Sequence, residues 1–382
     1  MSGMKPAIYT TVAHDEHDER HHGAVTFPIY QNTLFSFAGY HQPANPYTYS
    51  RGTNPTVREL ERKLAELEGG EDARCCASGM AAISAAILSR VQAGDHIVCV
   101  DQVYTGTRAF LEGWLPRFGV STTFVNGASL PDLEAATLEH TVLLYLESPT
   151  SFFFELQDIA ACAALAKRRG LTTILDNSWA TPCFQRPLEL GVDLVVHSLT
   201  KYVGGHSDAL GGAVIGSRDN IRRILEKEGV LLGGVMTAHT ASLMLRGLRT
   251  LPLRMERYRQ TGRIVADYLS GLAFINRINY PGLPNHPQHK LAIQQMDGFG
   301  SLLSFEWDVP LEQAQAWADA LRYYRNGCSW GGYESLVLVI APLSELGRSE
   351  PGILVRLYSG LEEPQALIDD MANAFAAILA GA

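Results

Sequence analysis

The chain has 382 residues and a net charge of −9, with 46% hydrophobic and 19% charged residues. This composition excludes a disordered chain, and the length predicts two to three domains. The acidic balance argues against a nucleic-acid or anionic-membrane partner. No apolar run is long enough for a transmembrane helix, and the N-terminal residues lack the hydrophobic region of a signal peptide. Six cysteines, two of them adjacent, are not expected to form a disulfide framework in a chain of this length. We therefore expect a cytoplasmic protein with reduced thiols and no membrane or nucleic-acid partner.

The N-terminal third begins without regular periodicity. Residues 1–55 predict an extended arm, because they are polar and show no sustained hydrophobic period. A helix is then predicted from Thr56, as the N-cap of a capping box that Glu59 completes, to Gly69. One apolar stripe on this helix is formed by Val57, Leu60, Leu64 and Leu67.

Short apolar segments follow that are typical of buried strands. They lie at 96–101, 121–125, 141–147, 171–176, 192–198 and 210–216, and a helix is predicted at 157–169 between two of them. Alternation of buried strands with helices predicts an α/β fold with a mostly parallel sheet that is covered on both faces.

A long helical pattern at 236–275 leads into a second, smaller unit. Strands at 300–307, 334–341 and 353–359, a helix at 311–323 and a terminal helix from 364 predict an α+β domain. We expect an arm at 1–55, a larger domain at 56–250 and a smaller domain at 251–382.

Histidines are concentrated near the N-terminus, where a spacing of three or four could place two on one face of a helix. They alternate with Asp, Glu and Arg in a polar segment, which also suits a solvated arm. We favour the solvated arm and predict no metal site at His14, His17, His21 and His22.

Lys201 differs from the other lysines of the chain. It directly follows an apolar strand and precedes Gly204 and Gly205, whereas Lys63, Lys167 and Lys227 stand among charges on helices and are expected to be solvated. Ligand chemistry in α/β sheets lies at the carboxyl ends of strands, and burial there would lower the pKa of a lysine, as a Schiff-base lysine requires. A lysine that snorkels from a strand end remains the alternative.

Further residues fit a site for pyridoxal 5′-phosphate (PLP). Asp176 ends a buried strand and could keep a pyridine nitrogen protonated, although it could also be a structural cap. A Ser-Gly turn before an Ala-rich helix offers free N–H groups to a phosphate. This phosphate cradle would consist of Ser78, Gly79, Met80, Ser198 and Thr200.

In this order of motifs the sequence resembles the PLP-dependent family of cysteine and methionine metabolism, the transsulfuration enzymes. The resemblance covers residue 23 to the terminal helix and is most specific in DNSWATPCFQRPLELGVDLVVHSLTKYVGGHSDALGG, at 176–212. It implies a PLP-dependent transferase-like fold of the aspartate aminotransferase type. It also implies that Lys201 binds the cofactor covalently, that Asp176 pairs with the pyridine nitrogen and that Tyr104 stacks on the ring.

The resemblance extends to residues that would complete the site. Tyr49 and Arg51 match residues that reach the phosphate from a neighbouring subunit, which implies a homotetramer of catalytic dimers. Arg356 matches the arginine that binds the substrate α-carboxylate, and Ser329 and Trp330 match residues beside it. An exposed loop position for Arg51 and a strand-end salt bridge for Arg356 are the alternatives.

Within this family, the sequence is most similar to cystathionine β-lyases. SWGGYESL at 329–336 has Trp330 where γ-acting members usually have Leu, and Ser151 stands where they typically have Asn. The segment at 50–56 is closer to γ-lyases and γ-synthases. We expect β-elimination of cystathionine or a related cysteine S-conjugate; a γ-acting lyase or synthase, and more remotely a non-catalytic binding protein, are the alternatives. Lys201, Tyr104 and Tyr49 are the expected catalytic residues.

Overall fold

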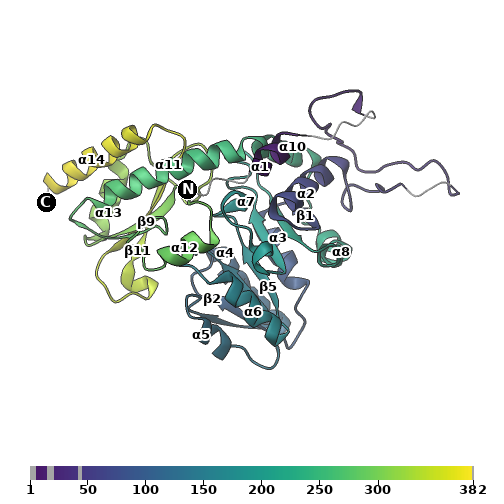
Figure 1. Cartoon of the computed structure of the whole chain (residues 1–382), viewed down its shortest axis with the longest axis horizontal. Coiled ribbons are helices and arrows are strands. Elements are labelled where there is room, and N and C mark those ends of the chain that lie inside the picture. Colours follow the sequence, from purple (N-terminus) through teal and green to yellow (C-terminus); the bar gives the residue numbers. More distant parts are fainter. Residues whose placement is uncertain (1–5, 15–20, 42–44, 381–382) are drawn as a thin grey trace.

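The computed structural model describes residues 6–14, 21–41 and 45–380, which form two β-sheets flanked by helices (Figure 1). The larger sheet has the strand order β1-β7-β6-β5-β4-β2-β3. Within it, only the contacts of β7 are antiparallel, so the sheet is mostly parallel as predicted. Its strands are β1 (Asp72–Cys76), β2 (His96–Val100), β3 (Ser121–Val125), β4 (Thr141–Glu147), β5 (Thr172–Asp176), β6 (Leu194–Ser198) and β7 (Gly212–Gly216).

Helices cover both faces of the larger sheet, which explains why most residues of its central strands are apolar. On β7, Ala213 and Ile215 belong to one core cluster and Val214 to another, as the alternation of side chains along a strand requires. The helices of this part are α2 (Pro55–Glu68), α3 (Gly79–Leu88), α4 (Thr105–Ala109), α5 (Leu130–Ala135), α6 (Ile159–Arg169), α7 (Thr181–Phe184), α8 (Arg218–Glu226), α9 (Glu228–Leu231) and α10 (Ala238–Arg249). A π-helical turn at Phe110–Trp114 and 3₁₀ turns at Leu115–Phe118 and Pro187–Leu190 complete them.

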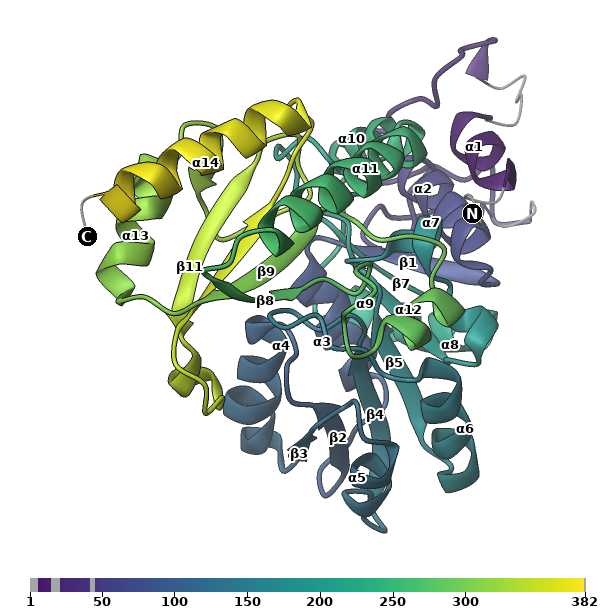
Figure 2. The ribbon, with the colours of Figure 1, turned by 60° about the vertical axis from the view of Figure 1, so that its left-hand side comes forward.

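The smaller sheet has the order β10-β11-β12-β9-β8 and is antiparallel except for the short contact of β10 with β11. Its strands are β8 (Ile275–Asn279), β9 (Leu302–Trp307), β10 (Arg325–Asn326), β11 (Leu336–Pro342) and β12 (Ile353–Tyr358). A separate core cluster joins it to α11 (Leu251–Ser270), α13 (Leu311–Ala320) and α14 (Pro364–Ala380). Helices α13 and α14 lie at the end of the molecule that is remote from the larger sheet (Figures 1 and 2). Helix α12 (His289–Gln295) and a 3₁₀ turn at Leu343–Leu346 lie in the connections.

The six strands predicted in the larger sheet and the three in the smaller one are present, with ends that differ by at most two residues. Three strands were not predicted: β1, which follows the Gly69–Gly70 turn, β8, which follows the long helical pattern, and the short β10. That pattern is itself two helices, because α10 ends before Thr250 and α11 begins at Leu251. Among the described residues, no helix combines the length and the apolar character that crossing a membrane requires.

Helix α2 begins two residues earlier than predicted, so the capping box at Thr56 is wrong. Asn54 is the N-cap, and its side chain accepts a hydrogen bond from the Thr56 amide at 3.0 Å. The Thr56 hydroxyl instead donates to the Pro28 carbonyl and accepts from the Tyr30 amide. Thr56 therefore joins the arm to the helix, while Gly69 ends the helix in the left-handed conformation as predicted.

The arm contains a helix that its sequence did not predict, α1 (Pro6–Ala13). Ile8 and Val12 of α1 are buried in the same core cluster as α2. Lys63 of α2 is also buried, at 1% exposure, and its ammonium group donates to the carbonyls of Thr11 and His14. Lys63 is thus an anchor for α1 at its C-terminal end rather than part of a solvated face.

Candidate active site

A cavity of about 370 Å³ lies between the two sheets, where the parallel strands of the larger sheet end. Residues from both sheets line it, so the site depends on the packing of one sheet against the other. All the residues that the sequence singled out for the site line this cavity, with the exception of Tyr49 and Arg51: Ser78, Gly79, Met80, Tyr104, Asp176, Ser198, Thr200, Lys201, Ser329, Trp330 and Arg356.

Lys201 follows β6 directly and extends its amine toward the smaller sheet. Its Nζ donates to Ser329 Oγ at 2.7 Å and lies 5.1 Å from the centroid of the Trp330 ring. Burial, together with the positive charge of Arg356, lowers the pKa of Lys201 to about 8. This lowered pKa raises the neutral fraction of the amine near physiological pH, and the neutral amine is the form that can act as a nucleophile or a base.

The loop that carries Ser329 and Trp330 is held close to Lys201. Gly331 has a φ of +93°, and a Cβ there would lie 2.8 Å from Lys201 Cα, so only glycine fits. The next carbonyl, of Gly332, accepts hydrogen bonds from the hydroxyls of both Tyr258 and Tyr358. These contacts fix the aromatic wall that faces the lysine.

Two carboxyl groups occupy the floor of the cavity. Asp176 and Glu147 end adjacent parallel strands and are partners in the strand register. Burial raises the pKa of both groups, and the proximity of Asp176 raises that of Glu147 further. Asp176 accepts a hydrogen bond from the Ser178 amide at 2.9 Å. The site therefore holds two acids of which one is readily protonated, because like charges at this depth repel each other.

The N-terminus of α3 forms a further part of the cavity wall. The Ser78 side chain caps the amide of Ala81 at 3.1 Å, which leaves the amides of Gly79 and Met80 without an acceptor inside the helix. A Cβ at Gly79 would lie 2.9 Å from Ser198 Oγ, so glycine lets the helix approach β6 closely. Free N–H groups, the helix dipole and the hydroxyl of Ser198 together make this end of the cavity suitable for an anion.

Tyr104 and Arg356 stand on different sides of the cavity. The Tyr104 amide donates to Glu147 Oε2 at 2.8 Å, and its ring is half-exposed. Arg356, on β12, is buried and donates from Nη2 to the Cys328 carbonyl at 2.7 Å. Burial lowers the pKa of this guanidinium, which remains charged and could bind a carboxylate.

Tyr49 and Arg51 do not line this cavity. They line a second cavity of about 230 Å³, together with residues 30–33 and 235–238. Tyr49 is 48% exposed, and the Arg51 guanidinium lies 5.4 Å from its ring centroid. Within one chain, the structure therefore does not bring these two residues to the site of Lys201.

Several cavity residues were missed by the sequence analysis. Glu147 is the most informative, because it ends a buried strand just as Asp176 does, and the same argument would have found it. The others lie in loops or in the apolar walls and carry no motif of their own: Ile83, Pro149, Thr150, Phe154, Ser178, Trp179, Leu210, Leu302 and Cys328. Ser151, which was noted only for its place in the sequence, also lines the cavity.

The N-terminal histidines form no recognisable metal site in the part of the chain that the structure describes. His17 lies outside the described residues, and His14, His21 and His22 lie inside them. Within residues 6–14, 21–41 and 45–380, no group of three or more His, Cys, Asp and Glu side chains could hold a metal ion.

Comparisons with known proteins agree with this geometry. The family model of Cys/Met metabolism PLP-dependent enzymes matches residues 9–376. An L-methionine gamma-lyase of Pseudomonas putida is 37% identical, over 98% of this chain and 99% of its own. A cystathionine beta-lyase of Lactococcus lactis is 38% identical, over 92% of this chain and 94% of its own.

A solved structure is similar to this chain over nearly its whole length. The crystal structure of metB from Corynebacterium glutamicum superposes with a TM-score of 0.92 at 32% identity, over 97% of this chain and 98% of its own. The expected PLP-dependent fold, with a mostly parallel sheet and a smaller second domain, is thereby confirmed. The chain belongs to the family of PLP-dependent enzymes of cysteine and methionine metabolism, and pyridoxal phosphate is its cofactor.

Proposed function

We propose that this enzyme is a carbon–sulfur lyase that catalyses β-elimination of cystathionine or a related cysteine S-conjugate, giving a thiol, pyruvate and ammonia. The observation that carries the assignment to PLP-dependent carbon–sulfur chemistry is the convergence of Lys201, Asp176 and Arg356 on one cavity. A lysine, an acid and a carboxylate-binding arginine are the groups that this chemistry requires.

The residues of the cavity fit the cofactor. The N-terminus of α3, with Gly79, Met80 and the hydroxyls of Ser78, Ser198 and Thr200, would hold the phosphate. Asp176 lies in the cavity, and burial disfavours its charged form. A protonated pyridine nitrogen would offset this cost, which suits Asp176 as its partner. Tyr104 would cover the ring.

When bound, the cofactor supplies an electron sink that stabilises negative charge at the substrate α-carbon. The amine of Lys201 would form the bond to the cofactor. Once this amine is free of that bond, it would act as the base that takes up the α-proton of the substrate. Its hydrogen bond with Ser329 fixes where that base lies. The lowered pKa of Lys201 favours the neutral form that accepts a proton.

Substrate orientation would come from the smaller sheet. Arg356 would bind the α-carboxylate, with Ser329 and Trp330 beside it, because its guanidinium lies on the same side of the cavity as both residues. The proton for the departing thiolate would come from Lys201 or from Tyr49. Since Tyr49 does not line the cavity of its own chain, the second assignment requires a neighbouring subunit.

The preference for β-elimination rests on the sequence around the cavity. Trp330 and the SWGGYESL motif resemble cystathionine β-lyases, as do RLYSGLEE and GGHSDAL. Ser151, where γ-acting members typically have Asn, donates to Glu147 at 2.5 Å. This hydrogen bond uses the single donor of the Ser151 hydroxyl. The amide of an Asn at this position would offer two N–H donors, so Ser151 cannot make the same set of contacts in the cavity.

A γ-acting enzyme is the second candidate. The segment SRGTNPT at 50–56 is closer to γ-lyases and γ-synthases, and several relatives are named as methionine or cystathionine γ-lyases. A non-catalytic binding protein would not need Lys201, Asp176 and Arg356 together in the cavity.

We further infer a sulfur amino acid as substrate, a cytoplasmic location and a homotetramer in which Tyr49 and Arg51 complete the neighbouring site.

Product analysis distinguishes the two candidates. The purified holoenzyme is incubated with cystathionine, and pyruvate and 2-oxobutyrate are quantified separately. Pyruvate as the main product supports β-elimination, whereas 2-oxobutyrate indicates γ-elimination and would contradict the proposal. The Lys201→Ala protein, which should fold but not turn over, is the control for non-enzymatic release.

A further inference from the structure

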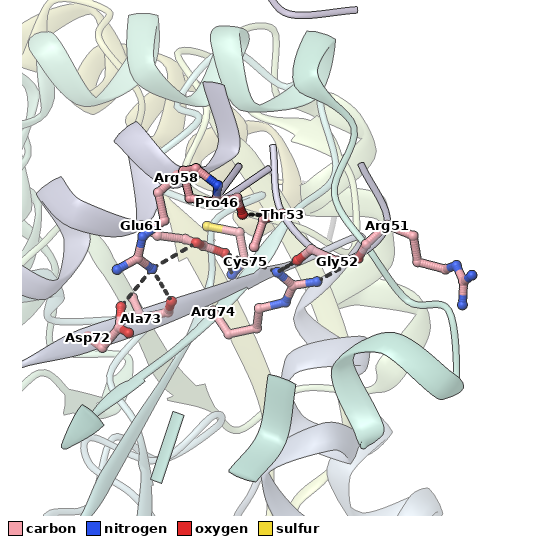
Figure 3. A network of polar contacts seen from close by, with 10 residues as sticks. All are labelled: Pro46, Arg51, Gly52, Thr53, Arg58, Glu61, Asp72, Ala73, Arg74 and Cys75. Carbon is pink, nitrogen blue, oxygen red and sulfur yellow. Dashed lines mark hydrogen bonds and ion pairs between the residues drawn. The ribbon is translucent and has the colours of Figure 1, made fainter. Parts of the chain in front are cut away.

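Arg74 forms a buried polar contact that the catalytic chemistry does not use. It lies on β1, shortly before the cavity residues Ser78 and Gly79, but it does not itself line the Lys201 cavity, and only 4% of its surface is exposed. Its guanidinium donates from Nη1 to the Gly52 carbonyl at 2.7 Å and from Nη2 to the Arg51 carbonyl at 3.0 Å. Figure 3 shows this contact, with the Arg51 side chain extending away from it.

A second buried charge holds Arg74 in place. Arg74 Nη1 lies 3.7 Å from Glu61 Oε1, and the same oxygen accepts the Cys75 amide at 2.9 Å. Glu61 also pairs with Arg58, which binds Asp72 in turn (Figure 3). Burying charges is costly, and replacing such a group by apolar residues is often neutral for stability. This network is therefore better explained by what it positions than by the stability it contributes.

The peptide that Arg74 holds is part of a tight turn. The Tyr49 carbonyl accepts hydrogen bonds from the amides of Gly52 at 2.9 Å and of Thr53 at 3.2 Å. Tyr49 and Arg51 therefore share one turn, and the orientation of two successive carbonyls decides where both side chains point. The planar fork of a guanidinium suits two adjacent acceptors, whereas a lysine would not span both in this geometry.

We propose that Arg74, supported by Glu61, is a positioning residue that orients the Tyr49–Gly52 turn so that Arg51 binds the cofactor phosphate of a neighbouring subunit. This inference rests on the proposed function, which assigns Arg51 to that phosphate. It adds a residue that touches neither cofactor nor substrate. Arg74 acts only through the backbone of Arg51 and Gly52.

The test compares binding of PLP with binding of pyridoxal, which lacks the phosphate. Full-length variants from which PLP has been removed are brought to equilibrium by dialysis against a series of concentrations of each ligand, and the bound ligand is measured by absorbance. Glu61→Gln/Arg74→Met removes both charges together, so that neither is left unpaired in the interior. We expect this double variant to weaken PLP binding about tenfold, because Arg51 would lose its charge-assisted hydrogen bond to the cofactor phosphate. Pyridoxal binding should stay unchanged, because pyridoxal has no phosphate.

Three further variants complete the design. Arg74→Lys keeps the positive charge beside Glu61 but loses the planar guanidinium. It should weaken PLP binding without weakening pyridoxal binding, and it replaces the double variant in the test if that variant does not fold. Glu61→Gln alone removes the support of Arg74 but keeps its guanidinium, so it should weaken PLP binding less than Arg74→Lys does. Arg222→Met, which removes an exposed ion pair with Asp219 on α8, is the matched surface control.

A double-mutant cycle with Arg51→Ala gives the decisive outcome. Changing Arg74 should have no further effect on PLP binding once Arg51 is absent. Equal weakening with and without Arg51, equal weakening of PLP and pyridoxal, or no weakening at all would overturn the inference. If Arg51→Ala binds PLP as tightly as the wild type, the role of Arg51 falls as well. The product assay on the wild type tests the lyase function independently of all these results.

Discussion

The chemistry of the site depends on a few ionisable side chains that lie close together in a small, buried space. Lys201 and Arg356 are the basic groups and Asp176 and Glu147 the acidic ones, all on the wall of one cavity. Each group alters the protonation of its neighbours, because charges interact strongly where water is excluded. Substituting one of them should therefore change the behaviour of another, which can be measured.

Arg356 is predicted to bind the substrate and not the cofactor. Arg356→Ala should raise the KM for the amino acid about tenfold to a hundredfold, because a charge-assisted pair with a carboxylate is lost. PLP content, measured by absorbance, should stay at the wild-type level, since the phosphate end of the cavity is untouched. Parallel loss of PLP and of substrate binding would contradict this assignment.

The pH dependence of cofactor attachment is predicted to report on the same arginine. The neutral amine of Lys201 reacts with the cofactor aldehyde, so the attachment rate should rise with pH through a midpoint near its pKa of about 8. Arg356 lowers that pKa by its positive charge, so Arg356→Gln should move the midpoint to higher pH. Stopped-flow absorbance of cofactor-free protein mixed with PLP measures it. An unchanged midpoint would show that burial alone sets the pKa.

At the scale of elements, the N-terminus of α2 connects the arm to the larger domain. Asn54 caps the helix with its carbonyl oxygen, and its amide group donates to the Tyr30 carbonyl at 2.8 Å. Asn54→Ala should therefore destabilise the protein by about 1–2 kcal/mol, since a cap and a buried hydrogen bond are lost. Ser217→Ala, at the exposed N-cap of α8, should have a smaller effect.

The midpoint of thermal unfolding, at fixed protein and PLP concentrations, is the measurement. If Thr56 were the cap, Asn54→Ala would remove only the hydrogen bond to the Tyr30 carbonyl, and the midpoint would fall less. A midpoint that falls no further than that of Ser217→Ala would contradict the structural assignment of the cap.

Elements with a strong periodic pattern could be predicted from the sequence, and their exact limits could not. Buried strands of the larger sheet were recognisable because both faces are covered and the residues are uniformly apolar. Thr56 and Asn54 are both good caps, and only the contact of Thr56 with Pro28 and Tyr30 decides between them. Lys63 seemed solvated because its neighbours in sequence are charged, but the packing of α1 buries it.

The site could be predicted to the extent that its residues follow strands or match a motif. Lys201 and Asp176 follow both rules. Glu147 follows the first rule and was overlooked, whereas Trp179 and Cys328 reach the cavity through tertiary packing that no local pattern encodes. The contact between Arg74 and the Arg51 carbonyl joins residues whose sequence neighbours give no sign of it.

At the scale of the whole molecule, one chain is predicted to hold an incomplete site. Tyr49 and Arg51 lie beside a cavity other than that of Lys201, so a symmetric oligomer would have to supply them. Lys201→Ala and Arg51→Ala proteins, each of low activity, should recover activity when their subunits are mixed and allowed to exchange. In random hybrids of a catalytic dimer, about a quarter of the sites would contain both native residues.

Recovery of activity after mixing, with no recovery when two preparations of the same variant are mixed, is the expected result. Activity that stays at the sum of the separate variants, although mass spectrometry shows mixed oligomers, would mean that both residues act in one chain. Sedimentation of the wild type would separately show whether the enzyme is a tetramer.

The central claim is that the amine of Lys201 carries the cofactor, and reductive trapping tests it most directly. The holoenzyme is treated with borohydride, which fixes the cofactor to its lysine, and is then digested and mapped by mass spectrometry. We predict a phosphopyridoxyl group on Lys201 and its absence from the other lysines. Labelling of a different lysine, or no labelled peptide from protein saturated with PLP, would contradict the account.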